Sequence, residues 1–227
     1  MNEPIARRLG AKAADMVLPG AVLGLGSGRA AEAFLRALAA RVSDGLQVRG
    51  VATSEATAAL ARQLGVPLAT LDELESIDLA VDGADEVSPA LDLIKGYGGA
   101  LLREKVVAEA ARRLVILVGP EKLVDVLGAR GRLPVEVAPF ARAACARRLR
   151  ALGYETRPRV GAGGDLYVTD NGNHILDCAV SAIPDPRRLD DAMRAIPGVI
   201  ATGLFVGLAQ TVLVGRENGI DVRTRKP

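Results

Sequence analysis

Short apolar segments alternate with longer amphipathic segments through the first 130 residues, and this alternation constrains the fold more than any other feature. The apolar segments have the length of buried strands, and the amphipathic segments have the period of helices. We expect strands at residues 21–25, 47–52, 77–81, 91–94 and 114–118, and helices at 5–17, 29–40, 54–64 and 100–113. Strands separated by helices of about 10–15 residues indicate βαβ units. The sequence therefore predicts an α/β domain built on a parallel sheet.

The pattern changes after Pro134 and indicates a second, smaller domain. Its expected strands are residues 134–137, 154–160, 166–169, 174–178 and 199–205, and its expected helices are 140–152 and 186–196. Asn171-Gly172 is a strong hairpin signal between residues 166–169 and 174–178. The order β-α-β-β-α-β matches a ferredoxin-like α+β unit. We therefore place the α/β domain at residues 1–130, completed by 203–227, and the α+β domain at 131–202. The apolar stretch 210–214 is expected to return to the first domain.

The composition narrows the class of protein. Hydrophobic residues make up 49% and charged residues 25% of the 227 residues, which is typical of a folded globular chain. The apolar runs are too short to span a bilayer, and the N-terminus carries no visible secretory signal. We therefore expect a cytoplasmic protein that does not act at a membrane. A net charge of +2 and a total of three Phe, three Tyr and no Trp argue against nucleic-acid binding.

The rare reactive residues exclude several chemistries. Two cysteines and one histidine cannot form a disulfide framework or a His-rich metal cluster, and we interpret Cys145, Cys178 and His174 as structural. Most of the 29 basic residues are arginine. The few lysines are therefore of interest, because a lysine in such a chain can mark a position whose function requires a compact ammonium instead of a planar guanidinium. Lys95 and Lys122 are the two that lie near other candidate residues.

The first candidate site is the glycine turn Gly26–Gly28, which lies between an expected strand and an expected helix. Glycines at such a turn let backbone N–H groups approach an anion. The turn also fits the lenient dinucleotide fingerprint, but the next strand ends at Thr53-Ser54 and offers no acid for a ribose. The hydroxyls of these residues and of Ser27, together with Arg29, favour a phosphate site. The alternative for the glycines alone is a tight turn without a ligand.

The second candidate is the acidic segment 82–86, directly after the expected buried strand 77–81. The carboxyl edge of a parallel sheet is where such folds bind ligands. The alternatives are an Asx-type turn of solvated acids and a Mg²⁺ site.

The third candidate is the glycine loop, residues 95–99, with the helix that follows it. Lys95 lies at a strand end, and Glu104 lies in the first turns of the helix. Glu104 could instead interact with the helix dipole or pair with Arg103 or Lys105. The combination of Asp82, Asp85, Lys95 and Glu104 around one sheet edge is the informative feature.

The residues of these three segments resemble type A ribose-5-phosphate isomerase, and the resemblance extends over nearly the whole chain. Its most specific stretch is DLAVDGADEVSPALDLIKGYGGALLREKVVA at 78–108. The supporting segments are GLGSG at 24–28, TSEAT at 53–57, EKLV at 121–124, LPVEVAPFA at 133–141, TDNGNHILD at 169–177 and IPGVIATGLF at 196–205. The resemblance implies an aldose–ketose isomerase of the pentose phosphate pathway that needs no cofactor or metal. It also implies a homodimer or homotetramer of Rossmann-like domains with small lid domains.

The resemblance also assigns roles to individual positions. The family's base falls on Glu104, its Asp-Gly-Ala-Asp segment on Asp82, Gly83, Ala84 and Asp85, its lysine loop on Lys95, Gly96, Tyr97 and Gly98, and its substrate-contacting lysine on Lys122. Tyr97 replaces a glycine. The family's phosphate turn, usually Thr-Gly-Ser-Thr, is here Ser27, Gly28, Arg29 and Ala30, so two hydroxyls are missing. A family lysine near the N-terminus is also absent, and the nearest basic residues are Arg7 and Arg8. Arg29 could restore the lost charge and bind phosphate bidentately.

The expected mechanism moves one proton between C1 and C2 of the sugar through an enediolate. Glu104 is the candidate base, and Lys95 is the candidate cation for the enediolate oxygens. Asp82 and Asp85 could open the furanose ring, shuttle protons between O1 and O2, or hold Lys95. A metal-assisted hydride shift would need a His/carboxylate site, which a single histidine argues against. The alternative functions are a nicotinamide-dependent oxidoreductase and a non-catalytic sugar-phosphate-sensing domain.

Overall fold

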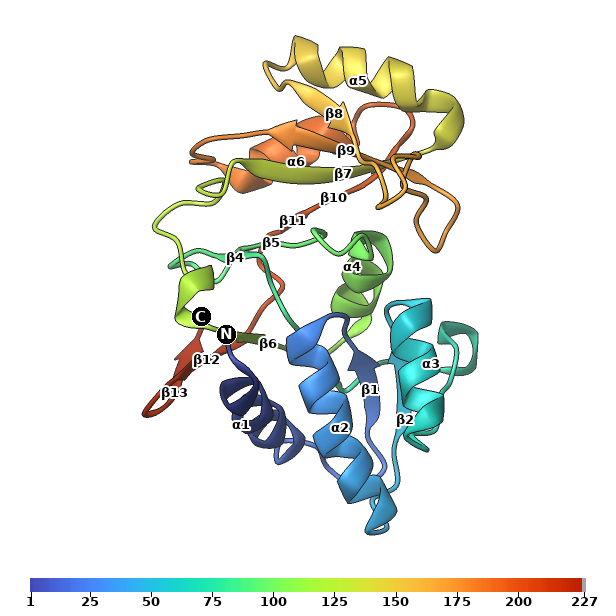
Figure 1. Ribbon diagram of the computed structural model, residues 1–227, viewed down its shortest axis with the longest axis vertical. Coiled ribbons are helices and arrows are strands. Elements are labelled where there is room, and N and C mark those ends of the chain that lie inside the picture. The colour runs from blue at the N-terminus through green and yellow to red at the C-terminus, as the bar shows by residue number, and fades with distance from the viewer. Residues whose placement is uncertain (226–227) are drawn as a thin grey trace. The chain divides into compact units, whose positions relative to one another are not determined.

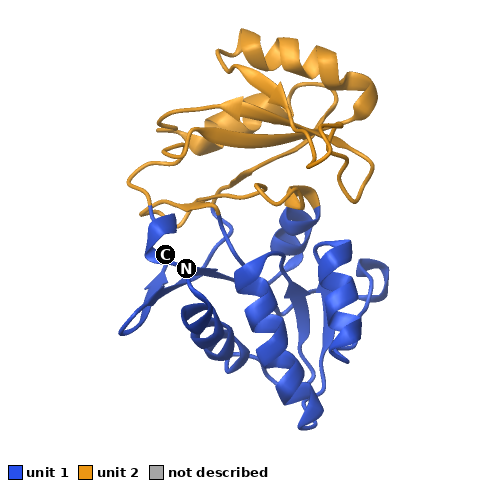
Figure 2. Cartoon of the chain, viewed as in Figure 1, with its two compact units in different colours: residues 1–84, 103–123, 207–227 blue, residues 85–102, 124–206 orange. Residues whose placement is uncertain are grey.

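The computed structural model describes residues 1–225 (Figure 1). The chain divides into two compact units, which Figure 2 colours separately. Unit 1 comprises residues 1–84, 103–123 and the chain from 207 onward, and unit 2 comprises 85–102 and 124–206. The predicted boundaries differ from this division at residues 85–102, 124–130 and 203–206, which the sequence-based division gave to the first domain. Residues 85–102 and 203–206 lie in unit 2 because two segments of the first join Leu204–Phe205 in one three-stranded sheet.

Unit 1 is built on a six-stranded sheet of order β13-β12-β6-β3-β1-β2. Its strands are β1 (Val22–Leu25), β2 (Arg49–Ala52), β3 (Leu79–Asp82), β6 (Leu114–Val118), β12 (Thr211–Arg216) and β13 (Gly219–Thr224). The first five of these are parallel, which confirms the predicted parallel sheet, and β13 pairs antiparallel to β12. The strand β12 confirms the predicted return of residues 210–214. The parallel strands have the doubly wound order 2-1-3-4-5, whose switch point lies between β1 and β3.

Helices cover both faces of this sheet. They are α1 (Glu3–Ala14), α2 (Arg29–Ser43), α3 (Glu55–Gln63) and α4 (Leu101–Ala110), which enters unit 1 at residue 103. Leu9 of α1 and Phe34 of α2 are fully buried in one cluster with Leu23 of β1. Successive strand residues point to opposite faces, so Gly24 faces the other side. There a Cβ would lie 2.5 Å from Cγ1 of Val107, and glycine therefore lets α4 approach β1 closely.

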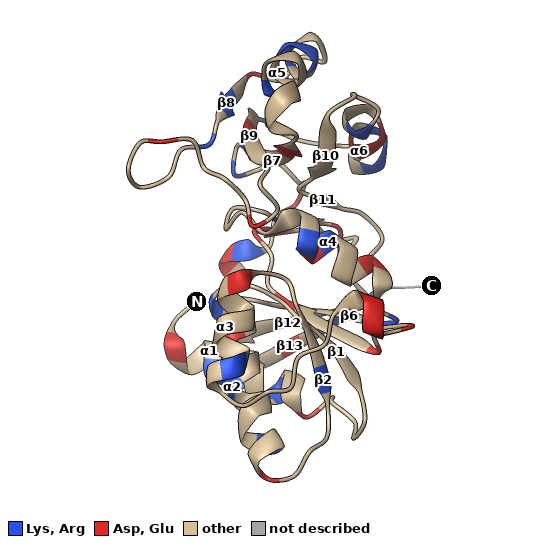
Figure 3. Cartoon of the chain, turned by 90° about the vertical axis from the view of Figure 1, so that its right-hand side faces the viewer, with Lys and Arg blue, Asp and Glu red and all other residues tan. Residues whose placement is uncertain are grey.

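Unit 2 contains the predicted ferredoxin-like arrangement. Its elements in chain order are β7 (Arg132–Val137), α5 (Arg142–Ala151), β8 (Thr156–Pro158), β9 (His174–Ala179), α6 (Pro186–Arg194) and β10 (Val199–Thr202). The sheet order is β10-β7-β9-β8, and every pair is antiparallel. The two helices pack on one face of the sheet, and Figure 3 shows Lys and Arg positions along both of them. Cys145 and Cys178 are buried in this packing, and burial raises the pKa of the Cys178 thiol to about 12.

Two details of the predicted second domain are wrong. Residues 166–169 form only isolated bridges instead of a strand, because they pair at one residue each with two different segments, Leu166 with Val160 and Val168 with His174. The predicted strand 199–205 is interrupted at Gly203, where a Cβ would lie 2.4 Å from the Lys95 carbonyl oxygen. Its second half is β11 (Leu204–Phe205), which joins β5 (Leu93–Ile94) and β4 (Glu86–Val87) in a three-stranded sheet.

Short 3₁₀ helices complete the described elements. They are η1 (Leu71–Glu73), η2 (Pro120–Lys122) and η3 (Pro139–Ala141). Within residues 1–225, no helix has the length and apolar character needed to cross a membrane.

Candidate active site

The turn between β1 and α2, residues 26–28, lies at the switch point of the unit 1 sheet beside the end of β3. Oδ1 of Asp82 accepts hydrogen bonds from the backbone N–H of Ser27 at 3.1 Å and of Gly83 at 2.7 Å. A Cβ at Gly26 would lie 2.3 Å from Cγ of Asp82. The turn therefore needs glycine at position 26 in order to approach the carboxylate. Asp82, which is 3% exposed, ties the ends of the two strands together.

Four hydroxyl groups meet at this turn. Oγ of Ser27 lies 2.8 Å from Oγ1 of Thr53, 2.9 Å from Oγ of Ser54 and 3.3 Å from Oγ1 of Thr57. Ser54 is also the N-cap of α3, as its position predicts, and accepts from the backbone N–H of Thr57. The structure thus brings together the three hydroxyl residues singled out in the sequence. Thr57 was missed as an individual residue, although it lies in the segment 53–57 that supported the resemblance.

The first turn of α2 faces this cluster with an uncapped end. Gly28 is the N-cap, with a φ of +84°, and it has no side chain that could bond the first N–H groups of the helix. Such N–H groups attract anions. Arg29 is exposed, and its Nη1 donates to the Met1 carbonyl at 3.0 Å. The structure therefore ties Arg29 to the N-terminal end of the chain, while the hydroxyl cluster involves residues 27 and 53–57.

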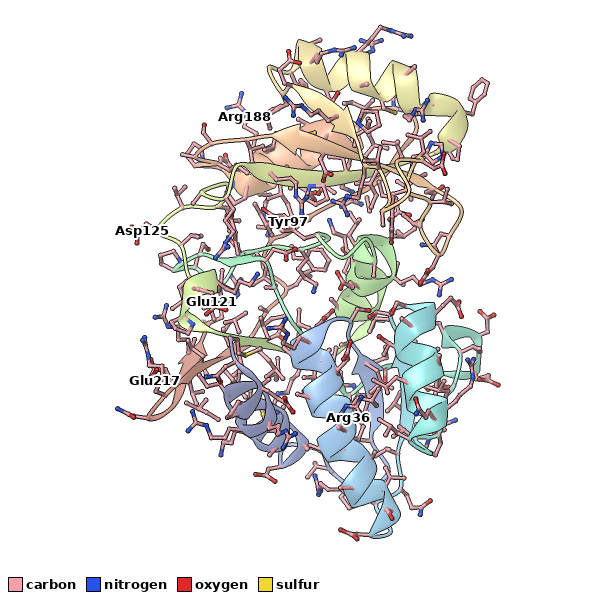
Figure 4. The ribbon with its side chains drawn as sticks, in the orientation of Figure 1. Arg36, Tyr97, Glu121, Asp125, Arg188 and Glu217 are labelled. Carbon is pink, nitrogen blue, oxygen red and sulfur yellow. The ribbon has the colours of Figure 1, made fainter. Side chains whose placement is uncertain are left out.

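Two further predicted residues lie in unit 1. Glu104 is only 7% exposed, although it is a carboxylate on a short helix. Its neighbour Arg103 pairs with Glu55 at 2.7 Å, and this hydrogen bond and charge lower the pKa of Glu55. Lys122 is partly exposed and ends η2, which directly follows β6, the strand next to β3. Glu121, labelled in Figure 4, binds the Met1 ammonium at 2.7 Å.

Unit 2 holds the other predicted catalytic residues at the open end of the β4–β5 hairpin. The antiparallel register pairs Glu86 with Ile94 and so places Asp85 opposite Lys95. The backbone N–H of Asp85 donates to the Ile94 carbonyl at 2.8 Å, and that of Lys95 donates to the Gly203 carbonyl at 2.9 Å. Lys95 is 4% exposed. The hairpin therefore fixes both backbone positions.

Tyr97, which replaces a glycine of the family, anchors the glycine loop. Its backbone N–H donates to Oδ2 of Asp85 at 2.9 Å, and its hydroxyl donates to the Arg132 carbonyl at 3.1 Å. The Arg132 guanidinium lies 3.9 Å from the centre of the Tyr97 ring. Burial raises the pKa of the Tyr97 phenol, and the carboxylates of Glu86 and Asp85 raise it further. Figure 4 labels this residue among the side chains of unit 2.

The carboxylates of the described residues do not assemble a metal centre. No group of three or more His, Cys, Asp or Glu side chains between residues 1 and 225 could hold a metal ion. The three carboxylates of the segment 82–86 each accept from backbone N–H groups: Asp82 in the β1–α2 turn, Asp85 in the glycine loop, and Glu86 from Gly128 and Arg130.

Known proteins match this chain over nearly its full length. A family model described as Ribose 5-phosphate isomerase A (phosphoriboisomerase A) matches residues 49–219. Ribose-5-phosphate isomerase A of Roseiflexus castenholzii is 52% identical over 216 residues, which is 94% of this chain and 92% of the relative. That of Gloeobacter violaceus is 50% identical over 225 residues, or 99% of this chain and 96% of the relative.

Solved structures give the same result. Ribose 5-phosphate isomerase A from Methanocaldococcus jannaschii superimposes with a TM-score of 0.94 at 39% identity, covering 99% of this chain and 100% of that one. A D-ribose-5-phosphate isomerase in complex with phospho-erythronic acid has a TM-score of 0.94 at 37% identity, with the same coverage.

These matches identify the class of enzyme as an aldose–ketose isomerase. More particularly, the chain belongs to the ribose 5-phosphate isomerase A family, and it interconverts ribose 5-phosphate and ribulose 5-phosphate in the pentose phosphate pathway. Membership of this family excludes the two alternative functions, the oxidoreductase and the sugar-phosphate-sensing domain.

Proposed function

We propose that Glu104 is the general base that moves the proton between C1 and C2 of the sugar phosphate. The observation that carries the assignment is the burial of this carboxylate, at 7% exposure, on a helix whose Glu109 is exposed. Carboxylates are rarely buried unless they are paired or used. One carboxylate suffices for the reaction if it reaches both carbons, and a positioned base contributes about 10²–10⁴-fold to the rate.

Lys95 stabilises the negative charge that develops on O1 and O2 in the enediolate. An ammonium held in a buried position is effective because surrounding water does not screen its charge. Asp82 and Asp85 either open the furanose ring or relay protons between O1 and O2. Their backbone hydrogen bonds support a further task, which is to fix the β1–α2 turn and the glycine loop, respectively.

The phosphate of the substrate binds at the start of α2. The uncapped N–H groups after Gly28 and the Ser27 hydroxyl supply the donors. Arg29 adds a charge there only if it exchanges its bond to the Met1 carbonyl for one to phosphate. The proposed set of substrate-binding residues is completed by Ala30, Gly83, Ala84, Gly96, Tyr97, Gly98 and Lys122.

The enzyme acts as a homodimer or homotetramer, without a cofactor and with the smaller domain as a lid, and these properties rest on the resemblance. Its expected cytoplasmic location rests on the sequence itself. Light scattering after size exclusion tests the oligomer. A monomer at micromolar concentration would contradict it.

The mechanism is tested by converting ribose 5-phosphate in D₂O with EDTA present and no nucleotide added. NMR of the product measures the deuterium at the carbon that receives the proton. An enediolate formed by a carboxylate base predicts measurable deuterium incorporation because the base exchanges its proton with solvent. Product without deuterium, together with activity that is lost on chelation and restored by Mg²⁺ or Mn²⁺, would indicate a metal-assisted hydride shift.

A further inference from the structure

We propose that Arg159 is a positioning residue that holds the glycine loop, residues 95–99, in the conformation that presents Lys95. Arg159 lies just after β8, and its guanidinium reaches the loop from the ferredoxin-like part of unit 2. The inference rests on the proposed role of Lys95 in stabilising the enediolate. It assigns a function to a residue that lies outside the segments described above as the site.

The guanidinium of Arg159 joins the loop to the sheet. On the loop side, Nη1 donates to the Gly96 carbonyl at 2.8 Å and to the Tyr97 carbonyl at 3.2 Å. On the sheet side, Nε donates to Oδ2 of Asp177 at 3.0 Å and Nη2 donates to Oδ1 at 2.5 Å. The Arg159 side chain is 9% exposed and that of Asp177 is 16% exposed. These hydrogen bonds are therefore shielded from solvent. Charge-assisted hydrogen bonds are strong in such a position.

The loop depends on such a restraint because its own sequence provides little stiffness. Gly96 and Gly99 have φ values of +102° and +92°, which favour glycine, and a Cβ at Gly98 would meet no atom within 4 Å. Glycine-rich segments lose the most conformational entropy when they are ordered. Lys95 is directly bonded to the first of these glycines. The hairpin fixes Lys95 through its backbone N–H, and Arg159 holds the carbonyls of the two residues that follow it, so the restraint continues from Lys95 into the loop.

Arginine suits this position because its planar group offers five donors in a fixed fork. Two donors bind the Asp177 carboxylate side by side, while a third faces the two loop carbonyls. Lysine has the same charge but cannot make this bidentate pair and reach the loop in one fixed geometry. Asp177 orients the guanidinium from β9, so it acts through Arg159.

The test compares Arg159→Met with Arg188→Met, which changes an exposed arginine on α6 of the same unit and serves as the matched control (Figure 4). We expect Arg159→Met to lower kcat by about 10²-fold, the cost of a displacement of roughly 1 Å in a catalytic group. KM should change less than kcat, because the phosphate binds at the start of α2 and not at this loop. Arg159→Lys should restore little of the loss. Hydrogen exchange should become faster in residues 95–101 and remain unchanged in β12.

A double variant separates this inference from the proposed role of Lys95. In the Lys95→Met background, Arg159→Met should change kcat by no more than about twofold, because both act through one group. Losses that multiply, or a folded Arg159→Met enzyme with normal kcat, would overturn the positioning role. If Lys95→Met alone keeps kcat within about tenfold, the catalytic role of Lys95 fails instead. Asp177→Asn, which weakens the pair without removing the arginine, replaces Arg159→Met if that variant does not fold, and it should also lower kcat more than KM.

Discussion

Two glycine-containing loops of this enzyme are built on opposite plans. Each is tied to one carboxylate through a backbone N–H, the β1–α2 turn to Asp82 and the glycine loop to Asp85. The β1–α2 turn is then fixed by close backbone approach and by short hydroxyl side chains, since Ser27 lies within hydrogen-bond distance of three other hydroxyls. The glycine loop is instead held by long side chains, those of Tyr97 and Arg159.

This difference predicts how each loop responds to substitution. The two loops differ at single positions: a Cβ at Gly26 would overlap Asp82, whereas one at Gly98 would meet no atom within 4 Å. Elsewhere each loop is mixed, since a Cβ at Gly28 would also meet open space and Cβ atoms at Gly96 and Gly99 would meet Leu101 and Tyr167. A crowded turn keeps its N–H groups in one direction, which suits the binding of an anion. The glycine loop has long side chains, those of Tyr97 and Arg159, as additional restraints. Damage to the turn should therefore affect folding and phosphate binding, and damage to the restraints on the glycine loop should affect kcat.

The largest effect should come from Glu104→Gln, which removes the proposed base and belongs to neither loop. We expect kcat to fall by at least about 10²–10⁴-fold with the melting temperature nearly unchanged. Glu109→Gln, an exposed change on the same helix, is the control. Steady-state kinetics and deuterium exchange measure the outcome. Activity within about tenfold of wild type, with solvent deuterium still entering the product, would remove Glu104 from this role.

The second effect compares the two loops directly through Gly26→Ala and Gly98→Ala. The methyl group at position 26 must displace Asp82, so we expect a loss of about 1–3 kcal/mol in the free energy of unfolding. The same methyl group at position 98 should change stability by no more than about 0.5 kcal/mol. Urea denaturation of both variants measures this. Equal losses would show that the two loops do not differ in the way proposed here.

The third effect concerns the charge near the β1–α2 turn. If Arg29 binds the phosphate, Arg29→Ala should raise KM by roughly tenfold, or about 1.4 kcal/mol, with a smaller change in kcat. Added salt should then weaken wild-type binding more than that of the variant. Arg36→Ala, at an exposed position further along α2, is the control (Figure 4). An unchanged KM would mean that Arg29 bonds only to Met1 and does not bind the phosphate, which Ser27 and the backbone would then hold.

The smallest effect should be that of chelation. Asp82 and Asp85 are each bonded to backbone N–H groups of their own loop, so we expect activity to survive exhaustive treatment with EDTA. Inactivation that Mg²⁺ or Mn²⁺ reverses would show instead that these carboxylates bind a metal. Ca²⁺, which prefers a larger oxygen cage, is a useful control ion in that case.

The strand pattern of unit 1 was predictable because buried parallel strands are apolar along their whole length. Residues 114–118 are such a run and form β6 with the expected bounds. The segments of unit 2 that differ from prediction are two-residue strands and isolated bridges, such as β4 and the bridge between Val168 and His174. Pairings of one or two residues are too short to produce a hydrophobic period in the sequence. Their position depends on which strand edges the tertiary structure leaves free.

The sequence by itself determined the α/β and ferredoxin-like element order, the Ser54 cap, and the residues that carry the family resemblance. These follow from local propensity, hydrophobic period and residue identity. Only the tertiary structure decided that Thr57 joins the hydroxyl cluster, that Arg29 bonds to Met1, and that Arg159 holds the glycine loop. Each of these contacts joins residues that are distant along the chain, 63 positions apart for Arg159 and Gly96. No local rule encodes such contacts, because they depend on how strands and helices pack.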